Sequence, residues 1–341
     1  MHSNIKLTFL KLLSSLKLWL SFYSLSIYIY VLKMISPIKH LIESDKKNDS
    51  QNITVVCRVR PINHRESTIG ANISTLKTKC VSVQEGNKSI IINTKPEAKN
   101  YTFDYVADEN TSQEKMFQVV GLPVTNTCLE GYNSTIICYG QTGSGKSYTT
   151  FGVANSTNGD TTRGLVPRVL EYIFQHISKV QSDIYSQQNN LSVTYTCGCS
   201  FYEIYQEKVF DLLDPISVGQ NINTPQNSLQ VREDTRLGVY VVGLIEESVS
   251  SSDDATRVLA LGYNNRHVGE TNMNRESSRS HAVFLLNIKS VEVNNDTGVK
   301  RHCMSKFSLV DLAGRYVCVC VSICGCFYMC IFVCAGVGVC I

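Results

Sequence analysis

One loop limits what this chain can fold into more than any other stretch. Residues 132–152 read YNSTIICYGQTGSGKSYTTFG, and residues 140–147 within them match the phosphate-binding pattern GxxxxGK[ST]. The apolar, β-branched run 134–139 comes directly before the loop, as expected of a buried strand. Glycines let the backbone curl until several amide N–H groups point at one place, and a following helix adds its positive end. An ordinary glycine-rich turn is the alternative, but this order of strand, loop, lysine and serine predicts a nucleotide site.

The loop residues have separate expected roles. Lys146 can reach the β- and γ-phosphates, and the Ser147 hydroxyl can ligate Mg²⁺. The predicted nucleotide contacts in the loop are Gly140, Gln141, Thr142, Gly143, Ser144, Gly145, Lys146 and Ser147.

The charge distribution argues against a nucleic-acid partner. The formal net charge of the 341 residues is +3, but the first 50 residues hold seven lysines and three acidic residues. Residues 51–314 hold 24 basic and 26 acidic residues, so the central region lacks the basic surface that nucleic acids require.

The cysteines fall into two groups. Seven of the 14 lie between residues 318 and 340, and the other seven are scattered, mostly in apolar runs where cysteine acts as a small hydrophobe. A phosphate-binding enzyme belongs in a reducing compartment, so free thiols are expected rather than disulfides.

The N-terminal region 1–52 differs from the rest of the chain. Residues 5–35 are apolar and aromatic with interspersed lysines, and the longest lysine-free run, 18–32, has 15 residues. A bilayer span needs about 20 residues, so membrane insertion as an anchor or signal peptide is the less favoured alternative. We interpret 1–52 as an extension outside the native domain, with Met34 as an alternative start and a polar linker at 43–52.

From residue 53 the pattern alternates between strands and helices. Strands are expected at 53–61, 81–92, 101–105, 134–139, 192–205, 209–213, 229–244, 282–293 and 304–312. Helices are expected within 112–131, at 165–180 and from the acidic start at 250–254 towards residue 269. This alternation predicts a three-layer α/β domain with a mixed central sheet and helices on both faces.

Two further segments could complete a phosphate site. Residues 274–281 read NRESSRSH, where Ser278 could ligate Mg²⁺ and Ser277 could lie near the γ-phosphate and the attacking water, although a solvated polar loop is the alternative. Residues 311–314 read DLAG after an apolar strand, so Asp311 could hold the Mg²⁺ shell and the Gly314 amide could bind the γ-phosphate.

Taken together in this order, these segments resemble the kinesin motor domain. The strings that carry the resemblance run from residue 53 to 314 and are CRVRP, GYNSTIICYGQTGSGKSYT, RGLVPR, SFYEIYQEKVFDLLDP, NRESSRSHAVF and SLVDLAG. The stretches GVYVVGLIEESV and MNRESSRSHAVF look most like the kinesin-twelve group.

The resemblance implies a P-loop NTPase of kinesin type that hydrolyses ATP with Mg²⁺ and couples this to microtubule binding. Arg58 and Pro61 match the adenine-side residues, and Tyr148 matches the residue that stacks on the base. Ser147 stands where most kinesins carry Thr, and both offer a hydroxyl to Mg²⁺. The implied catalytic residues are Lys146, Ser277, Arg279 and Gly314, and the implied metal ligands are Ser147, Ser278 and Asp311.

The resemblance ends abruptly after Gly314. Kinesins continue DLAG with Ser-Glu-Arg, and that Glu pairs with the arginine that Arg279 matches; here Arg315 and Tyr316 follow instead. The helices that follow in the family, including the main tubulin-binding one, and the neck linker are absent as well. We therefore expect little ATP hydrolysis and a sheet with an unpaired apolar edge. Because native domains hold only about 5–15 kcal/mol of stability, we expect an unstable or aggregated product.

Three interpretations of the tail 315–341 compete. A metal site would use its cysteines, but the tail has no C-x₂-C spacing and no histidine. A membrane anchor would use the uncharged run 317–341. We favour translation into an intron, because alternating Cys and Val are what TGT-GTG repeats encode, and AGG-TAT-GTG at 315–317 would contain a splice-donor-like GTATG.

The expected function is therefore that of an ATP-dependent microtubule motor in the cytoplasm and on the microtubule cytoskeleton. Dimerisation is expected through a stalk that this chain lacks. The alternative is a non-motile nucleotide-binding or tubulin-interaction module that is tethered by its apolar ends.

If residues 315–341 are a translated intron, the spliced transcript should not encode them. Sequencing the message across codons 300–341 should show a spliced product in which Asp-Leu-Ala-Gly is followed by Ser-Glu. A message that encodes the cysteine-rich tail as printed would contradict intron read-through and establish the tail as part of the product.

Overall fold

The computed structural model describes residues 53–62, 81–93, 97–153, 160–186, 191–214, 228–234, 238–273, 279–314, 328–336 and 339–340. The predicted extension 1–52, residues 274–278 of the predicted segment 274–281, and residues 315–327, 337–338 and 341 of the predicted tail 315–341 lie outside these ranges. No helix in the described ranges is long and apolar enough to cross a membrane.

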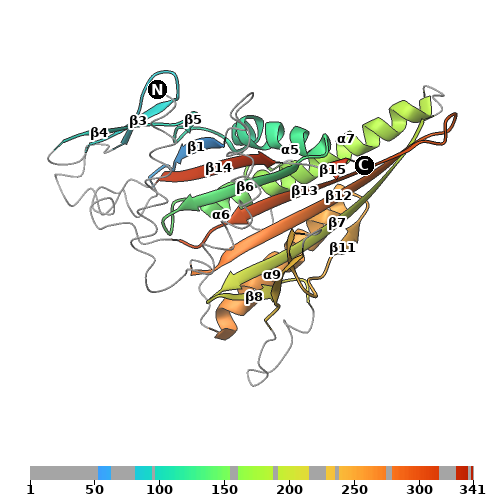
Figure 1. Ribbon diagram of the computed structural model, residues 1–341. Coiled ribbons are helices and arrows are strands. Elements are labelled where there is room, and N and C mark those ends of the chain that lie inside the picture. Colours follow the sequence, from blue (N-terminus) through green and yellow to red (C-terminus); the bar gives the residue numbers. More distant parts are fainter. Residues whose placement is uncertain are drawn as a thin grey trace.

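A ten-stranded mixed sheet forms the centre of the fold (Figure 1). Its main strand order is β11-β7-β12-β13-β6-β14-β1-β5, with β8 paired to β7 and β15 to β13. The bounds are β1 Thr54–Val59, β5 Tyr105–Ala107, β6 Asn133–Gly140, β7 Leu191–Tyr205, β8 Lys208–Asp211, β11 Glu247–Val249, β12 His281–Asn294, β13 Lys300–Asp311, β14 Tyr328–Gly336 and β15 Val339–Cys340. The predicted mixed sheet is confirmed, since β6 pairs in parallel with β13 and β1 with β5, while the other pairs are antiparallel.

Two small sheets accompany the large one. Their strands are β2 Val81–Val83, β3 Ser89–Ile92 and β4 Lys99–Thr102 in the first, and β9 Val231–Asp234 and β10 Gly238–Val241 in the second. The predicted strands at 81–92 and 229–244 are thus hairpins outside the main sheet.

The helices occur where the periodicity predicts them. Their bounds are α4 Gln113–Met116, the π-helical turn η1 Phe117–Gly121, α5 Leu122–Leu129, α6 Lys146–Thr150, α7 Leu165–Ser186 and α9 Ser252–Met273. The Ser112 side chain caps α4 by accepting a hydrogen bond from the Lys115 amide. Helix α7 buries one apolar stripe, which is the spacing expected of an amphipathic helix on a sheet.

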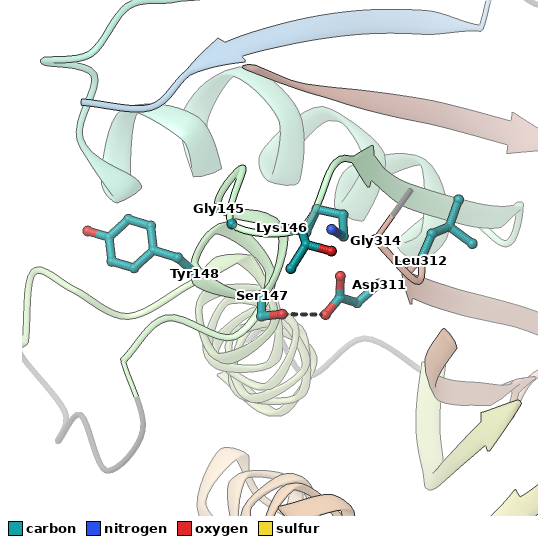
Figure 2. Close-up of a pocket in the computed structure, with 9 residues that line it drawn as sticks. Gly145, Lys146, Ser147, Tyr148, Asp311, Leu312 and Gly314 are labelled. Atoms are coloured by element: carbon teal, nitrogen blue, oxygen red, sulfur yellow. Dashed lines mark hydrogen bonds between the residues drawn. The ribbon is translucent and has the colours of Figure 1, made fainter. Parts of the chain in front are cut away.

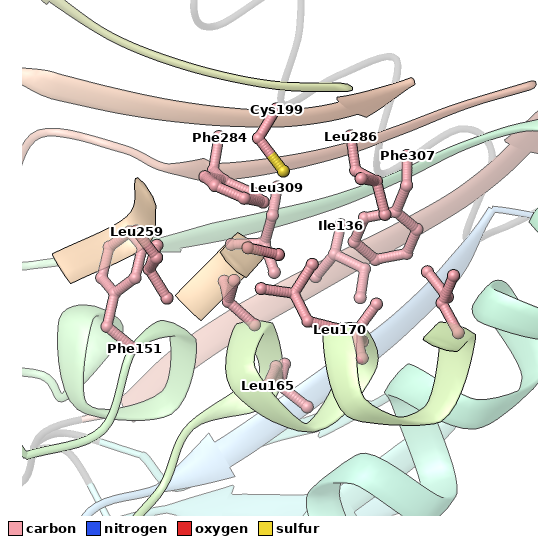
Figure 3. Packing of buried hydrophobic residues seen from close by; sticks show 14 of the residues in the cluster. Ile136, Phe151, Leu165, Leu170, Cys199, Leu259, Phe284, Leu286, Phe307 and Leu309 are labelled. Atoms are coloured by element: carbon pink, nitrogen blue, oxygen red, sulfur yellow. The ribbon is translucent and has the colours of Figure 1, made fainter. Parts of the chain in front are cut away.

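The main core lies between one face of the sheet and the helices α5, α7 and α9 (Figure 3). Strand alternation sends Phe201 of β7 into this core, whereas its neighbour Tyr202 points to the opposite face and joins a second cluster. That second cluster contains Val283 and Val310 and packs against Leu229 and Val241.

Strand β14 overturns the expectation of an unpaired edge. It lies between β1 and β6, with Val333 opposite both Thr54 and Ile136. It is antiparallel to both neighbours, so β1 and β6 run in the same direction with a reversed strand between them. The tail is rich in valine, isoleucine and aromatic residues, which favour extended structure, and pairing satisfies the backbone groups of both neighbours.

The position of β14 predicts a strong effect of Ile331→Pro. Ile331 lies opposite Val56 and Cys138, and proline lacks the amide that a central strand must donate. Losing roughly 2–3 kcal/mol would lower the thermal midpoint by roughly 5–10 °C, as measured by circular dichroism. The matched variant Ile331→Val should melt within about 2 °C of the parent chain. Equal midpoints for the proline and valine variants would contradict the placement of this strand.

Candidate functional site

The predicted phosphate loop connects β6 to α6. Gly143 and Gly145 have φ angles of 79° and 96°, which fall in the left-handed region that a side chain makes costly. Gly145 is also the residue before the first turn of α6, so the backbone reverses at the point where Lys146 begins the helix. The glycines of the motif are therefore required by the backbone geometry of the turn.

A pocket of about 260 Å³ opens between this loop and the end of β13 (Figure 2). Its lining residues are Thr142, Gly143, Gly145, Lys146, Ser147, Tyr148, Asp311, Leu312 and Gly314. The two segments meet because β6 and β13 are parallel neighbours, with Asp311 opposite Cys138, and the carboxyl ends of parallel strands lie at the same edge of a sheet.

Ser147 and Asp311 form the centre of the pocket. The Ser147 hydroxyl donates a hydrogen bond of 2.7 Å to Asp311 Oδ2 (Figure 2). Asp311 is 2% exposed, and its Oδ1 has no hydrogen-bond partner among the residues that the structure describes. A hydroxyl and a buried carboxylate at this separation are oxygen ligands of the kind Mg²⁺ prefers, so the residues present fit this ion. In the described ranges, no group of three or more His, Cys, Asp or Glu residues offers another metal site.

Lys146 is buried beside the same carboxylate. Its Nζ donates to the carbonyl oxygens of Gly140 and Gln141 at 3.1 and 3.0 Å. Burial lowers the pKa of Lys146, and the charge of Asp311 opposes that shift. A partly desolvated ammonium held at the loop is suited to stabilise an anionic ligand such as a phosphate chain.

Two of the three residues predicted for the base side, Tyr148 and Arg58, lie close together. The Tyr148 ring is 42% exposed, and the guanidinium carbon of Arg58 lies 5.6 Å from its centroid. Figure 2 shows Tyr148 extending away from Lys146, so the aromatic ring and the ammonium lie on different sides of the pocket. Pro61 follows β1 and is exposed, and it does not line the pocket.

Gly314 approaches the phosphate loop closely. A Cβ atom at this position would lie 2.9 Å from the Thr142 amide nitrogen and 3.0 Å from its Cα. The end of the DLAG segment can therefore pack on the loop because residue 314 has no side chain.

The predicted residues of the NRESSRSH segment are not assembled into the pocket. Ser277 and Ser278 lie outside the described residues. Arg279 is described and exposed, and it does not line the pocket. Gln141 and Ser144 of the loop are buried, and within the described part of the chain the Gln141 Nε2 and Ser144 Oγ atoms lack hydrogen-bond partners.

Sequence reasoning missed one buried charge next to the site. Arg266 of α9 lies with its Nη1 3.6 Å from Asp311 Oδ2 and its Nε 3.6 Å from Glu203 Oε1. Both Arg266 and Glu203 are almost fully buried. The available signal was Glu203 itself, an acidic residue in the apolar strand FYEIY, because a buried charge requires a partner.

Comparisons with known proteins show that this chain is similar to kinesins. Residues 58–317 match the family described as the kinesin motor domain. The kinesin-like protein KIF15 of Homo sapiens is 40% identical over 268 residues, which are 78% of this chain and 18% of that protein. The kinesin-like protein KIN-12E of Arabidopsis thaliana is 42% identical over 268 residues, covering 77% of this chain and 19% of that protein. The chain thus spans less than a fifth of the length of these relatives.

A solved structure described as that of a fast kinesin is similar in fold. It has a TM-score of 0.64 and 36% sequence identity, over 79% of this chain and 67% of that chain.

The contact between Gly314 and Thr142 predicts the effect of Gly314→Ala. The added methyl group would push the loop out of place at a cost of about 1–3 kcal/mol, so affinity for ATP with Mg²⁺ should fall about tenfold or more. Isothermal titration calorimetry measures this affinity. The control Gly298→Ala lies at the β12–β13 turn with φ 68° and no neighbour within 4 Å, so it should leave ATP affinity unchanged. Unaltered ATP affinity in Gly314→Ala would refute the role of this close approach.

Proposed function

Since this chain belongs to the kinesin motor domain family, we propose that it binds ATP with Mg²⁺ as the head of an ATP-driven microtubule motor. One observation carries the proposal: the parallel pairing of β6 and β13 brings the Ser147 hydroxyl to 2.7 Å from Asp311, beside the buried Lys146. A cation-binding pair next to a lysine in a glycine loop suits a nucleotide triphosphate with its metal ion.

The phosphate side of the site would work through charge and positioning. Lys146 and the loop amides would stabilise the charge of the phosphates, and Ser147, Ser278 and Asp311 would hold Mg²⁺. Ser277 and the Gly314 amide would arrange the attacking water and the γ-phosphate. The base would stack on Tyr148 beside Arg58, with Pro61 near it.

Residues 53–314 would form the motor head, preceded by the extension 1–52 and followed by the tail 315–341.

Hydrolysis by the chain as printed would be slow. After DLAG the chain continues with Arg315 and Tyr316, where the family resemblance leads us to expect Ser-Glu, so it does not offer the glutamate that helps to position the water in the family. The proposed partner is the microtubule, with no nucleic-acid or membrane partner and with dimerisation through a stalk outside this chain. The proposed location is the cytoplasm and its microtubule cytoskeleton.

A second function, a non-motile nucleotide-binding module, is favoured by a different observation. Strand β14 fills the sheet between β1 and β6 with residues of the cysteine-rich tail. A chain completed in this way could bind nucleotide without the tubulin-binding helices that the family resemblance leads us to expect.

The proposal predicts the effect of Lys146→Ala. Removing the ammonium should weaken binding of ATP with Mg²⁺ by about 10- to 100-fold, because hydrogen bonds to charged groups contribute about 1.5–3 kcal/mol. Calorimetric titration of the full chain measures this. The control Lys306→Ala removes an exposed lysine of β13 and should not change ATP affinity. Equal affinity in the two variants would contradict a nucleotide site at this loop.

The motor and the module differ in turnover. A head extended through Ser-Glu-Arg and the following exons should hydrolyse ATP faster when microtubules are added, whereas the printed chain should bind ATP with little turnover. An extended head that binds ATP without microtubule stimulation would favour the module.

A further inference from the structure

One buried glutamine is hydrogen-bonded to both Tyr148 and Arg58. Gln113 is the first residue of α4 and is 2% exposed. Its Oε1 accepts a hydrogen bond of 2.7 Å from Arg58 Nη1, and its Nε2 donates one of 2.6 Å to the Tyr148 carbonyl oxygen. A second, longer contact of 3.4 Å runs from Nε2 to the Thr162 carbonyl oxygen. A single side-chain amide therefore holds the residue expected under the base and the arginine beside it.

The orientation of Arg58 depends on this contact. Its Nη1 also donates to Thr149 Oγ1 at 2.8 Å, and its Nη2 donates to the Thr111 carbonyl oxygen at 3.1 Å. The guanidinium is thus fixed by acceptors from α4, α6 and the turn before α4. In this fixed orientation, the guanidinium carbon of Arg58 lies 5.6 Å from the centroid of the Tyr148 ring.

The Tyr148 backbone depends on the same glutamine. Helix α6 has five residues, and its last carbonyl groups lack partners within the helix. In a continued helix the Gly152 amide would donate to the Tyr148 carbonyl, but here it donates to Ser147 instead, at 3.2 Å. Gln113 supplies the donor that the helix does not, so the backbone that carries the Tyr148 ring is held from outside α6.

We propose that Gln113 is a positioning residue that holds Tyr148 and Arg58 as one platform for the nucleotide base. Its side chain does not line the pocket, so it acts through those two residues rather than by touching the ligand. The inference rests on the proposed nucleotide site and adds that affinity for the base is set separately from affinity for the phosphates.

A purely structural role for a satisfied buried glutamine predicts something different. Loss of a structural contact would lower stability and weaken all ligands of the pocket together. Loss of a base platform weakens ATP but leaves a ligand without a base unaffected. Inorganic tripolyphosphate with Mg²⁺ carries the phosphate chain alone and separates the two roles.

The test compares ATP and tripolyphosphate binding to the full chain by calorimetry, with Mg²⁺ present throughout. Gln113→Leu removes the hydrogen bonds to Arg58 and Tyr148 and the longer one to Thr162, so ATP should bind about tenfold more weakly while tripolyphosphate affinity stays within about twofold of the parent. The matched control Gln118→Leu changes an exposed glutamine of η1 and should alter neither affinity. Thr149→Val removes another acceptor of Arg58 and should lower ATP affinity in the same selective way, though less. It decides the question if Gln113→Leu does not fold.

Each result has a defined meaning. Equal losses for both ligands, or unchanged ATP affinity, would overturn the positioning role while leaving the nucleotide site intact. A parent chain that bound neither ligand would overturn the proposed function and this inference with it.

Discussion

The parallel pairing of β6 and β13 is the constraint on which the site depends. It places Asp311 opposite Cys138, two residues before the loop begins at Gly140, so both strands deliver their loops to one edge of the sheet. Everything polar in the pocket follows from that register. A shift of one residue would turn the Asp311 side chain to the other face of the sheet, and Ser147 would lose its partner.

The free-energy cost of burying charge at this edge of the sheet explains why further charged residues lie behind the pocket. Asp311 and Lys146 are both nearly buried, and an isolated buried charge is costly. Arg266 and Glu203 continue the alternation of opposite charges away from the pocket. The polar network is therefore balanced before any ligand binds, and a ligand that brings both phosphates and a divalent cation preserves that balance.

The sequence predicts some parts of this molecule well and others not at all. The strand β6, the helix α6 that follows its glycine loop and the kinesin family are confirmed, because contiguous motifs carry their own local geometry. The hydrogen bond of Gln113 to Tyr148 and the ion pair of Arg266 with Glu203 could not be predicted, since these partners lie 35 and 63 residues away in sequence and no local pattern marks them. The prediction of an unpaired edge was wrong, because the β-branched residues of the tail supply a strand that the family pattern does not predict.

The reversed strand β14 has a consequence for the time course of folding. It comes after β13 in the chain, yet it lies between β1, which is the first described strand, and β6. Because residue 54 pairs with residue 333, the sheet can close only after both have been synthesised. Such non-local pairing makes folding slow and leaves the flanking strands exposed on the ribosome, where chaperones would be their natural first partners.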